Sequence, residues 1–121
     1  KFYFTGLPVH VSSARRIYPD SKMLQQYGIG PESFVQLCVR DRVIGLFPEE
    51  NKDAGGSLCR LSQGRLMLPA DWAQRNRIKG KCVYLFCIDG GILISAHPIA
   101  VLSMKAGRGE DVSVRLHYKA L

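Results

Sequence analysis

Two stretches of this chain repeat one pattern, and this duplication limits the possible folds more than any other feature of the sequence. Residues 12–19 contain an arginine, three largely apolar residues and then a proline. Residues 62–69 repeat that order at an offset of 50, which matches Arg65 with Arg15. The chain is therefore expected to contain two copies of one structural unit.

The two copies continue in parallel after their prolines. A short helix is expected there, because proline is favoured in a first helical turn; in the second copy it covers residues 70–77. Tight turns then separate pairs of apolar strands, and Cys38 and Cys87 fall at matching places. The predicted strands are residues 34–39 and 43–47 in the first copy, and 83–88 and 92–94 in the second.

An isolated hairpin is marginally stable in water, so the copies are expected to fold together as a single domain of 121 residues. The predicted fold is mainly β with two short helices. Repeat one covers about residues 9–50, a polar linker about 51–58, repeat two about 59–98 and a C-terminal extension 99–121. The alternating apolar residues of this extension predict an added β-hairpin with a turn at 106–109.

Charge is distributed unevenly between the copies. The net charge is +7; residues 1–50 hold six Lys/Arg and five Asp/Glu, and residues 51–121 hold eleven and five. Most of the excess lies between residues 60 and 81. Such a cluster is typical of a surface that binds a polyanion, and a solvated basic face is the alternative interpretation.

Several classes of protein do not fit the composition. With 46% hydrophobic and 22% charged residues, disorder is not expected, and no apolar run approaches the roughly 20 residues of a membrane span. The cysteines and histidines lack zinc-site spacing, so no metal or cofactor is expected, and the cysteines are interpreted as thiols of a reducing cytoplasm. No nucleophile motif is present, so we expect no enzymatic activity. The cysteines are Cys38, Cys59, Cys82 and Cys87.

The order glycine–arginine, apolar strand, proline, short helix, isoleucine and apolar hairpin resembles the AbrB/MazE/SpoVT swapped-hairpin superfamily. Within it, the chain is most similar to the MraZ family, whose members carry two such units. The best match is Ser62-Gln63-Gly64-Arg65-Leu66-Met67-Leu68-Pro69. The first copy is degenerate, because Ala14 stands where the motif has glycine, and Val11 and Leu61 stand where the family usually has aspartate.

The resemblance implies a swapped-hairpin β-barrel made of the two repeats, in a cytoplasmic, nucleoid-associated transcription regulator that binds double-stranded DNA. It also implies that DNA is contacted by the arginine of each motif and by basic residues at the end of the following helix. Many members oligomerise, so a homo-oligomer is one expectation. The residues expected to bind nucleic acid are Arg15, Arg16, Arg65, Arg75, Arg77, Lys79 and Lys81.

Each of these assignments has an alternative. The motif arginines could close loop ends by bonding to backbone carbonyls, and cations at a helix C-terminus complement its dipole. The aromatic side chains of Trp72, Tyr18 and Tyr27 are expected to pack rather than to stack on bases. For the whole chain, the alternative to a DNA-binding regulator is a protein-interaction module, or an antitoxin-like adaptor, on the same barrel.

Overall fold

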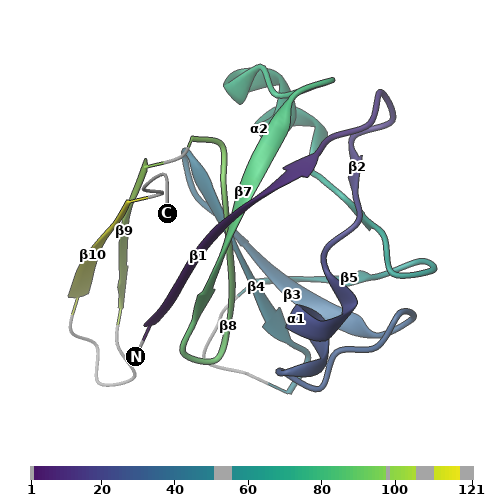
Figure 1. Cartoon of the computed structure of the whole chain (residues 1–121), viewed down its shortest axis with the longest axis horizontal. Coiled ribbons are helices and arrows are strands. Elements are labelled where there is room, and N and C mark those ends of the chain that lie inside the picture. Colours follow the sequence, from purple (N-terminus) through teal and green to yellow (C-terminus); the bar gives the residue numbers. More distant parts are fainter. Residues whose placement is uncertain (1, 51–55, 98, 106–110, 118–121) are drawn as a thin grey trace.

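The computed structural model describes residues 2–50, 56–97, 99–105 and 111–117. It confirms a mainly β fold with two short helices (Figure 1). Six strands form one antiparallel sheet in the order β1-β7-β8-β4-β3-β5, which leaves β1 and β5 as open edges. These strands are β1 Phe2–His10, β3 Phe34–Val39, β4 Val43–Pro48, β5 Ser57–Arg60, β7 Cys82–Ile88 and β8 Gly91–Ser95.

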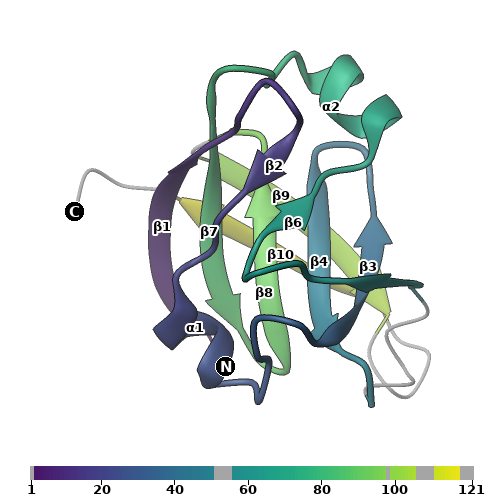
Figure 2. The ribbon, with the colours of Figure 1, turned by 90° about the vertical axis from the view of Figure 1, so that its right-hand side faces the viewer.

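The remaining elements lie over the two faces of this sheet. A two-stranded ribbon, β2 with β6, and both helices lie on one face, and the hairpin β9–β10 lies on the other (Figures 1 and 2). The predicted C-terminal hairpin is thus confirmed; its predicted turn at 106–109 falls outside the described residues. The bounds are β2 Arg16–Ile17, β6 Leu66–Met67, α1 Ser21–Gln25, α2 Ala70–Asn76, β9 Ile99–Lys105 and β10 Asp111–His117.

The first long strand of each half pairs with the hairpin of the other half. Strand β1 pairs with β7 of the second half, and β5 pairs with β3 of the first half. The two hairpins meet along β4 and β8 in the middle of the sheet, and the ribbon joins β2 to β6. The six-stranded sheet and the ribbon above it therefore both contain strands from the two halves, so neither half can form the sheet alone.

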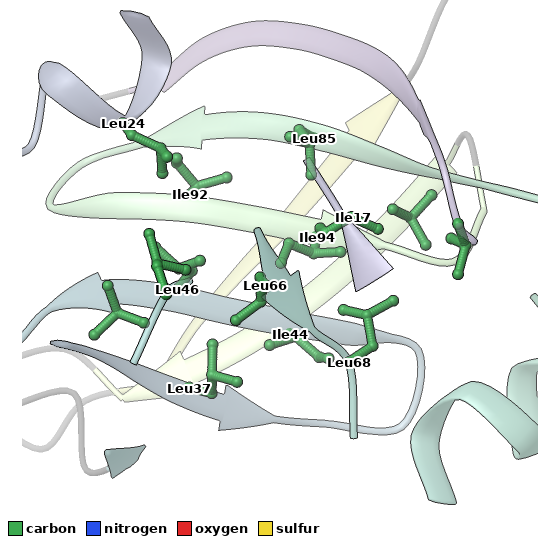
Figure 3. Packing of buried hydrophobic residues seen from close by; sticks show 14 of the residues in the cluster. Ile17, Leu24, Leu37, Ile44, Leu46, Leu66, Leu68, Leu85, Ile92 and Ile94 are labelled. Atoms are coloured by element: carbon green, nitrogen blue, oxygen red, sulfur yellow. The ribbon is translucent and has the colours of Figure 1, made fainter. Parts of the chain in front are cut away.

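The main core lies between the sheet and the ribbon. Ile17, Leu66 and Leu68 lie opposite sheet residues such as Ile44 and Ile94, and all five are at most 2% exposed (Figure 3). Met23 and Leu24 of α1, with Trp72 and Ala73 of α2, complete this cluster. Burying each leucine or isoleucine side chain contributes about 1.5–3 kcal/mol, which makes this the main stabilising layer.

The other face of the sheet is also buried. Phe86 and Leu93 have no exposed surface, although they alternate with the core residues Leu85 and Ile94 along their strands. The hairpin β9–β10 covers this face (Figures 1 and 2). The nearly continuous apolar run of residues 83–88 therefore forms a strand buried on both sides, as its composition predicted.

The turns that precede the ribbon correct the sequence alignment of the two halves. The N–H of Ser12 donates to the carbonyl of Arg16 (3.0 Å), whereas the N–H of Ser62 donates to the carbonyl of Arg65 (3.0 Å). The first turn is therefore one residue longer, and Arg16, rather than Arg15, is the counterpart of Arg65. The prolines do not correspond either: Pro19 is buried before the N-cap residue of α1, whereas Pro69 is itself the N-cap of α2.

The hairpins show a second slip of one residue. The turn at 40–43 closes β3–β4, and its counterpart in β7–β8 is the turn at 88–91. In this register Cys38 corresponds to Phe86, so the expected match of Cys38 with Cys87 is wrong. A shift of one residue moves a side chain to the other face of a sheet, and only Cys87 belongs to the core cluster.

Two strands begin earlier than the sequence indicated. Repeat one was expected from about residue 9 and repeat two from about residue 59, yet β1 starts at Phe2 and β5 at Ser57. Strand β1 contains Gly6 and Pro8, which interrupt the alternation that predicts a strand, and its register shifts between Tyr3 and Leu7. Both missed segments belong to the edge strands of the sheet.

No helix in the described part of the chain is long and apolar enough to cross a membrane.

We predict that Gly91→Ala destabilises the fold much more than Gly80→Ala. A Cβ at Gly91 would lie 2.4 Å from the carbonyl oxygen of Leu46 and 2.5 Å from the Phe47 ring, whereas one at Gly80 would meet nothing within 4 Å. Overpacking typically costs about 1–3 kcal/mol, so we expect a loss of about 3 kcal/mol at Gly91. At Gly80 only the left-handed backbone is penalised, by about 1 kcal/mol. Urea unfolding of both variants measures the difference; equal losses would contradict the close packing of β8 against β4.

Candidate nucleic-acid interface

The ribbon presents an outward face with two arginines from different halves. Arg16 lies opposite Met67, and the inward neighbours Ile17 and Leu66 are buried. Arg65 precedes β6 and is exposed like Arg16. The structure thus brings one predicted arginine of each half to the same face of the ribbon.

Two hollows flank the ribbon, and both are lined by Arg16 and Arg65. The larger, between β1 and β2, has a volume of about 780 Å³ and is also lined by Pro8, Ser12, Ala14 and Tyr18. The smaller, between β5 and β6, has a volume of about 210 Å³ and is also lined by Arg60, Ser62 and Met67. The two arginines therefore stand on a ridge between the hollows. We call these the β1–β2 hollow and the β5–β6 hollow.

Neither Arg16 nor Arg65 forms an ion pair with any residue that the structure describes. Arg60, which belongs to the same basic stretch of sequence, differs: its guanidinium lies 3.6 Å from the Glu32 carboxylate and 5.8 Å from the centre of the Phe34 ring. The two ridge arginines are therefore the cations of this surface that remain available to an anion.

Arg15 has a structural role at the end of the ribbon. Its Nε donates to the carbonyl of Leu68 (3.3 Å), while the N–H of Leu68 donates to the carbonyl of Arg15 (2.7 Å). Its backbone is left-handed, with φ of 61°. The alternative interpretation, in which a motif arginine closes a loop end on backbone carbonyls, therefore describes Arg15.

The predicted basic residues after the ribbon gather around the end of α2. Arg75 lies in its last turn, Arg77 is its C-cap, and Lys79 and Lys81 follow in an exposed loop. The carbonyl of Lys81 accepts the N–H of Val11 (2.7 Å), which places this loop beside the turn at 12–16. Arg75 is placed to complement the helix dipole. Lys79 and Lys81 lie beyond the end of the helix, so stabilisation of the dipole does not account for their charges.

The structure adds two cations that were not predicted to belong to this site. Asn76 donates its side-chain amide to the carbonyl of Asp41 (3.1 Å), which holds the β3–β4 turn against α2, as Figure 2 also shows. Arg40 and Arg42 flank Asp41 and are exposed. Their charges were visible in the sequence, but only the exchanged pairing of the halves brings this turn to α2. The basic end of the molecule comprises Arg40, Arg42, Arg75, Arg77, Lys79 and Lys81.

The corresponding end of the other half is acidic. Its loop after α1 occupies the place of residues 77–81, because the carbonyl of Ser33 accepts the N–H of Leu61 (2.9 Å) there. This loop carries Glu32, whose carboxylate accepts the N–H of Gln63 (2.8 Å). A small hollow beside it is lined by Glu32, Glu49 and Glu50. Elements at corresponding places in the two halves thus carry opposite charge.

The aromatic residues divide into two groups. Trp72 is fully buried, and Tyr27 is half-buried with its hydroxyl donating to the carbonyl of Ile88 (2.9 Å), so both pack as predicted. The prediction for Tyr18 is wrong, because its side chain is 67% exposed. Tyr18 follows the inward-facing Ile17, so strand alternation directs it to the outer face of the ribbon. Its ring lies over Gly64, whose Cβ position would be 2.9 Å from a ring carbon.

The cysteines offer no evident chemistry. All four are free thiols. Burial raises the pKa of the Cys87 thiol, partly offset by a hydrogen bond from Tyr27, and burial also raises the pKa of Cys38, partly offset by Arg40. Raised pKa values favour the unreactive thiol. Within the described ranges, no group of three His, Cys, Asp or Glu side chains is arranged to hold a metal ion.

Comparisons with protein families, with curated proteins and with solved structures found no match for this chain.

We predict that Arg77→Gly stabilises the protein. Arg77 has a φ of 54° at the C-cap of α2, a conformation that glycine adopts without strain, so the change should raise the free energy of unfolding by about 1 kcal/mol. Arg77→Ala is the matched control, because it removes the same charge but keeps a Cβ, and its stability should stay near that of the original protein. Chemical denaturation distinguishes them. Destabilisation by glycine would mean that the arginine side chain itself holds the helix end.

Proposed function

We propose that this chain is a DNA-binding transcription regulator of the AbrB/MraZ swapped-hairpin class, acting on double-stranded DNA in the cytoplasm. The observation that carries the proposal is the outward face of the ribbon, where Arg16 and Arg65 stand without carboxylate partners between two hollows. Exposed, unpaired guanidinium groups are the usual ligands of phosphate oxygens and of guanine edges.

The strand pairing supports the finer assignment of the fold. In a swapped-hairpin barrel each unit lends strands to the other, and here β1 pairs with β7 while β5 pairs with β3. We therefore propose that the two halves are tandem copies of one swapped-hairpin unit, with the ribbon closing the open side of the sheet into a barrel-like core. In this proposal the single chain takes the place of a dimer of separate units.

We propose that the ridge and the basic end make different contacts with DNA. The ridge arginines contact the groove or its rim, and a two-stranded ribbon is narrow enough for the major groove, which is about 12 Å wide. The basic end, which includes Arg75, Arg77, Lys79 and Lys81, attracts phosphates along one side. Because the other end carries Glu32, the chain would approach a duplex in one preferred orientation.

A second candidate function is a protein-interaction module or adaptor, and one observation favours it. Phe34 of β3 and Leu58 of β5 are 45% and 57% exposed, on neighbouring strands at an open edge of the sheet. Exposed apolar side chains beside an unpaired strand edge are suited to a protein partner. Neither side chain lines the two hollows beside the ridge, so the two functions could also coexist, as in an antitoxin that binds both DNA and protein.

We predict that Arg16→Gln and Arg65→Gln each flatten the salt dependence of DNA binding. Each lost phosphate contact lowers the slope of log K against log salt by about 0.9. Fluorescence anisotropy with a labelled random duplex between low and moderate salt measures this slope. Lys22→Gln is the matched control, because Lys22 is an exposed cation of α1, in the half whose loop carries Glu32. If all three variants keep the original slope, the ridge is not a DNA contact.

The double variant Arg75→Gln/Arg77→Gln tests the basic end in the same assay. We expect its slope to fall by about two units, because two phosphate contacts would be lost. An unchanged slope would show that the basic end is a solvated surface. No binding of the original protein to DNA at low salt would favour the adaptor function instead.

A further inference from the structure

We propose that the β1–β2 hollow binds a small organic anion with an apolar, ring-sized body, and that this ligand displaces DNA from the ridge. The binding site is inferred from the hollow and its lining residues alone, whereas the displacement of DNA rests on the proposed DNA-binding function. The hollow has a volume of about 780 Å³, within the 300–1,000 Å³ typical of small-molecule sites.

The walls of the hollow combine apolar surface with two cations. Pro8, Val9 and the side chain of Tyr18 supply apolar and aromatic surface, and Arg16 and Arg65 supply the guanidinium groups. Asp20 is the single carboxylate among the described lining residues, and it forms no ion pair with either arginine. The charge of the site therefore favours an anion, and its apolar wall favours a ring or hydrocarbon body on that anion.

The turn at 12–16 adds a polar group at the edge of the site. The Ser12 hydroxyl oxygen accepts the N–H groups of Ala14 (3.2 Å) and Arg16 (3.1 Å). Because both contacts use the oxygen as an acceptor, the hydroxyl hydrogen remains available to donate to a ligand oxygen. Ser12 lines the hollow, so its hydroxyl and the ridge arginines can act on one anionic group.

An added peptide strand is a poorer occupant of this site. Strand β1 is an edge of the sheet, but Pro8 has no N–H to donate to a further strand and so weakens the pairing capacity of that edge. A compact ligand does not need this edge. This contrast decides in favour of a small molecule over an extended peptide.

The β5–β6 hollow on the other side of the ridge shows that the large hollow is not a necessary product of the fold. It is lined by the same two arginines, yet its volume is only about 210 Å³. On that side Arg60 takes the place of His10 and lies over Phe34 beside Glu32, and Met67 of the ribbon itself also lines the hollow. The larger volume of the β1–β2 hollow therefore results from the particular residues of β1 and of the turn at 12–16 that follows it.

The ligand and DNA would need the same guanidinium groups. Arg16 and Arg65 line the hollow and also form the ridge. An anion bound in the hollow would neutralise both charges before a phosphate could reach them. Binding of the two partners would therefore be mutually exclusive, which would make the protein a ligand-responsive regulator.

Fluorescence titration with 8-anilinonaphthalene-1-sulfonate, an aryl anion, tests the site without DNA. We expect saturable binding to one site, at least tenfold weaker binding of the uncharged analogue N-phenyl-1-naphthylamine, and at least tenfold weaker binding of the sulfonate to Arg16→Gln. Ala14→Phe should abolish binding by filling the hollow, because Ala14 is exposed and lines it. Ser13→Phe is the matched control: Ser13 is exposed in the same turn but does not line the hollow, so binding should be unchanged.

Three results would overturn the binding site: equal affinity for the charged and uncharged probes, normal binding by Ala14→Phe, or loss of binding by Leu58→Ser, which would place the probe on the exposed β5 edge. Circular dichroism of each variant confirms that it is folded. If Ala14→Phe is not folded, the Arg16→Gln titration decides whether the hollow is the binding site.

Displacement is tested separately by adding the sulfonate to a protein–duplex complex. Release of the duplex by the sulfonate but not by the uncharged analogue supports competition. Simultaneous binding would overturn the displacement while leaving the binding site standing, and failure of the duplex to bind at all would count against the DNA-binding proposal alone.

Discussion

The exchange of strands between the two halves is the constraint on which the rest of the structure depends. Because β1 pairs with β7 and β5 pairs with β3, each half must cross the core face of the sheet to reach its own helix, and the two crossings meet as the β2–β6 ribbon. Ile17, Leu66 and the following Leu68 are buried beneath the ribbon, and strand alternation turns their sequence neighbours outward. The ridge that carries Arg16 and Arg65 is thus a direct consequence of the pairing that forms the core.

The backbone is close to twofold symmetric in its order of elements, but its charge is not. Helix α2 and the turn beside it carry the basic end, whereas the corresponding loop of the first half carries Glu32 and binds the neighbouring turn through backbone N–H groups. Core positions agree between the halves because both must fill one interior: Ile29 and Ile78, for example, are both buried. Exposed positions carry no such requirement, so the halves could diverge there without loss of the fold.

The sequence predicted elements better than it predicted register. Four apolar strands, the second helix and the C-terminal hairpin were found, because their patterns are long or strongly apolar. The residue-by-residue match of the halves was wrong because the first half has two extra residues. One lies in the turn at 12–16, and the other lies before the first hairpin. Each leaves the apolar pattern almost unchanged but shifts the correspondence of every later residue. For the same reason Arg15 was matched with Arg65 although Arg16 is its counterpart. Arg40, Arg42 and Tyr18 were missed because their surroundings come from distant parts of the chain.

Three residues with a Cβ, Arg15, Gln63 and Arg77, hold a left-handed backbone conformation that only glycine adopts without strain. Arg77 holds the left-handed conformation that ends α2, while the corresponding residue after α1 is Gly28, with φ of 72°. Arg15 is also left-handed, beside the loop that contains Lys81. A left-handed residue with a Cβ costs about 1 kcal/mol relative to glycine, which is a sizeable share of the 5–15 kcal/mol typical of a domain's stability. For Arg15 the bonds to Leu68 offset that cost. Among the described residues the side chain of Arg77 makes no such contact, so the end of α2 carries a backbone strain that glycine at the corresponding place after α1 avoids.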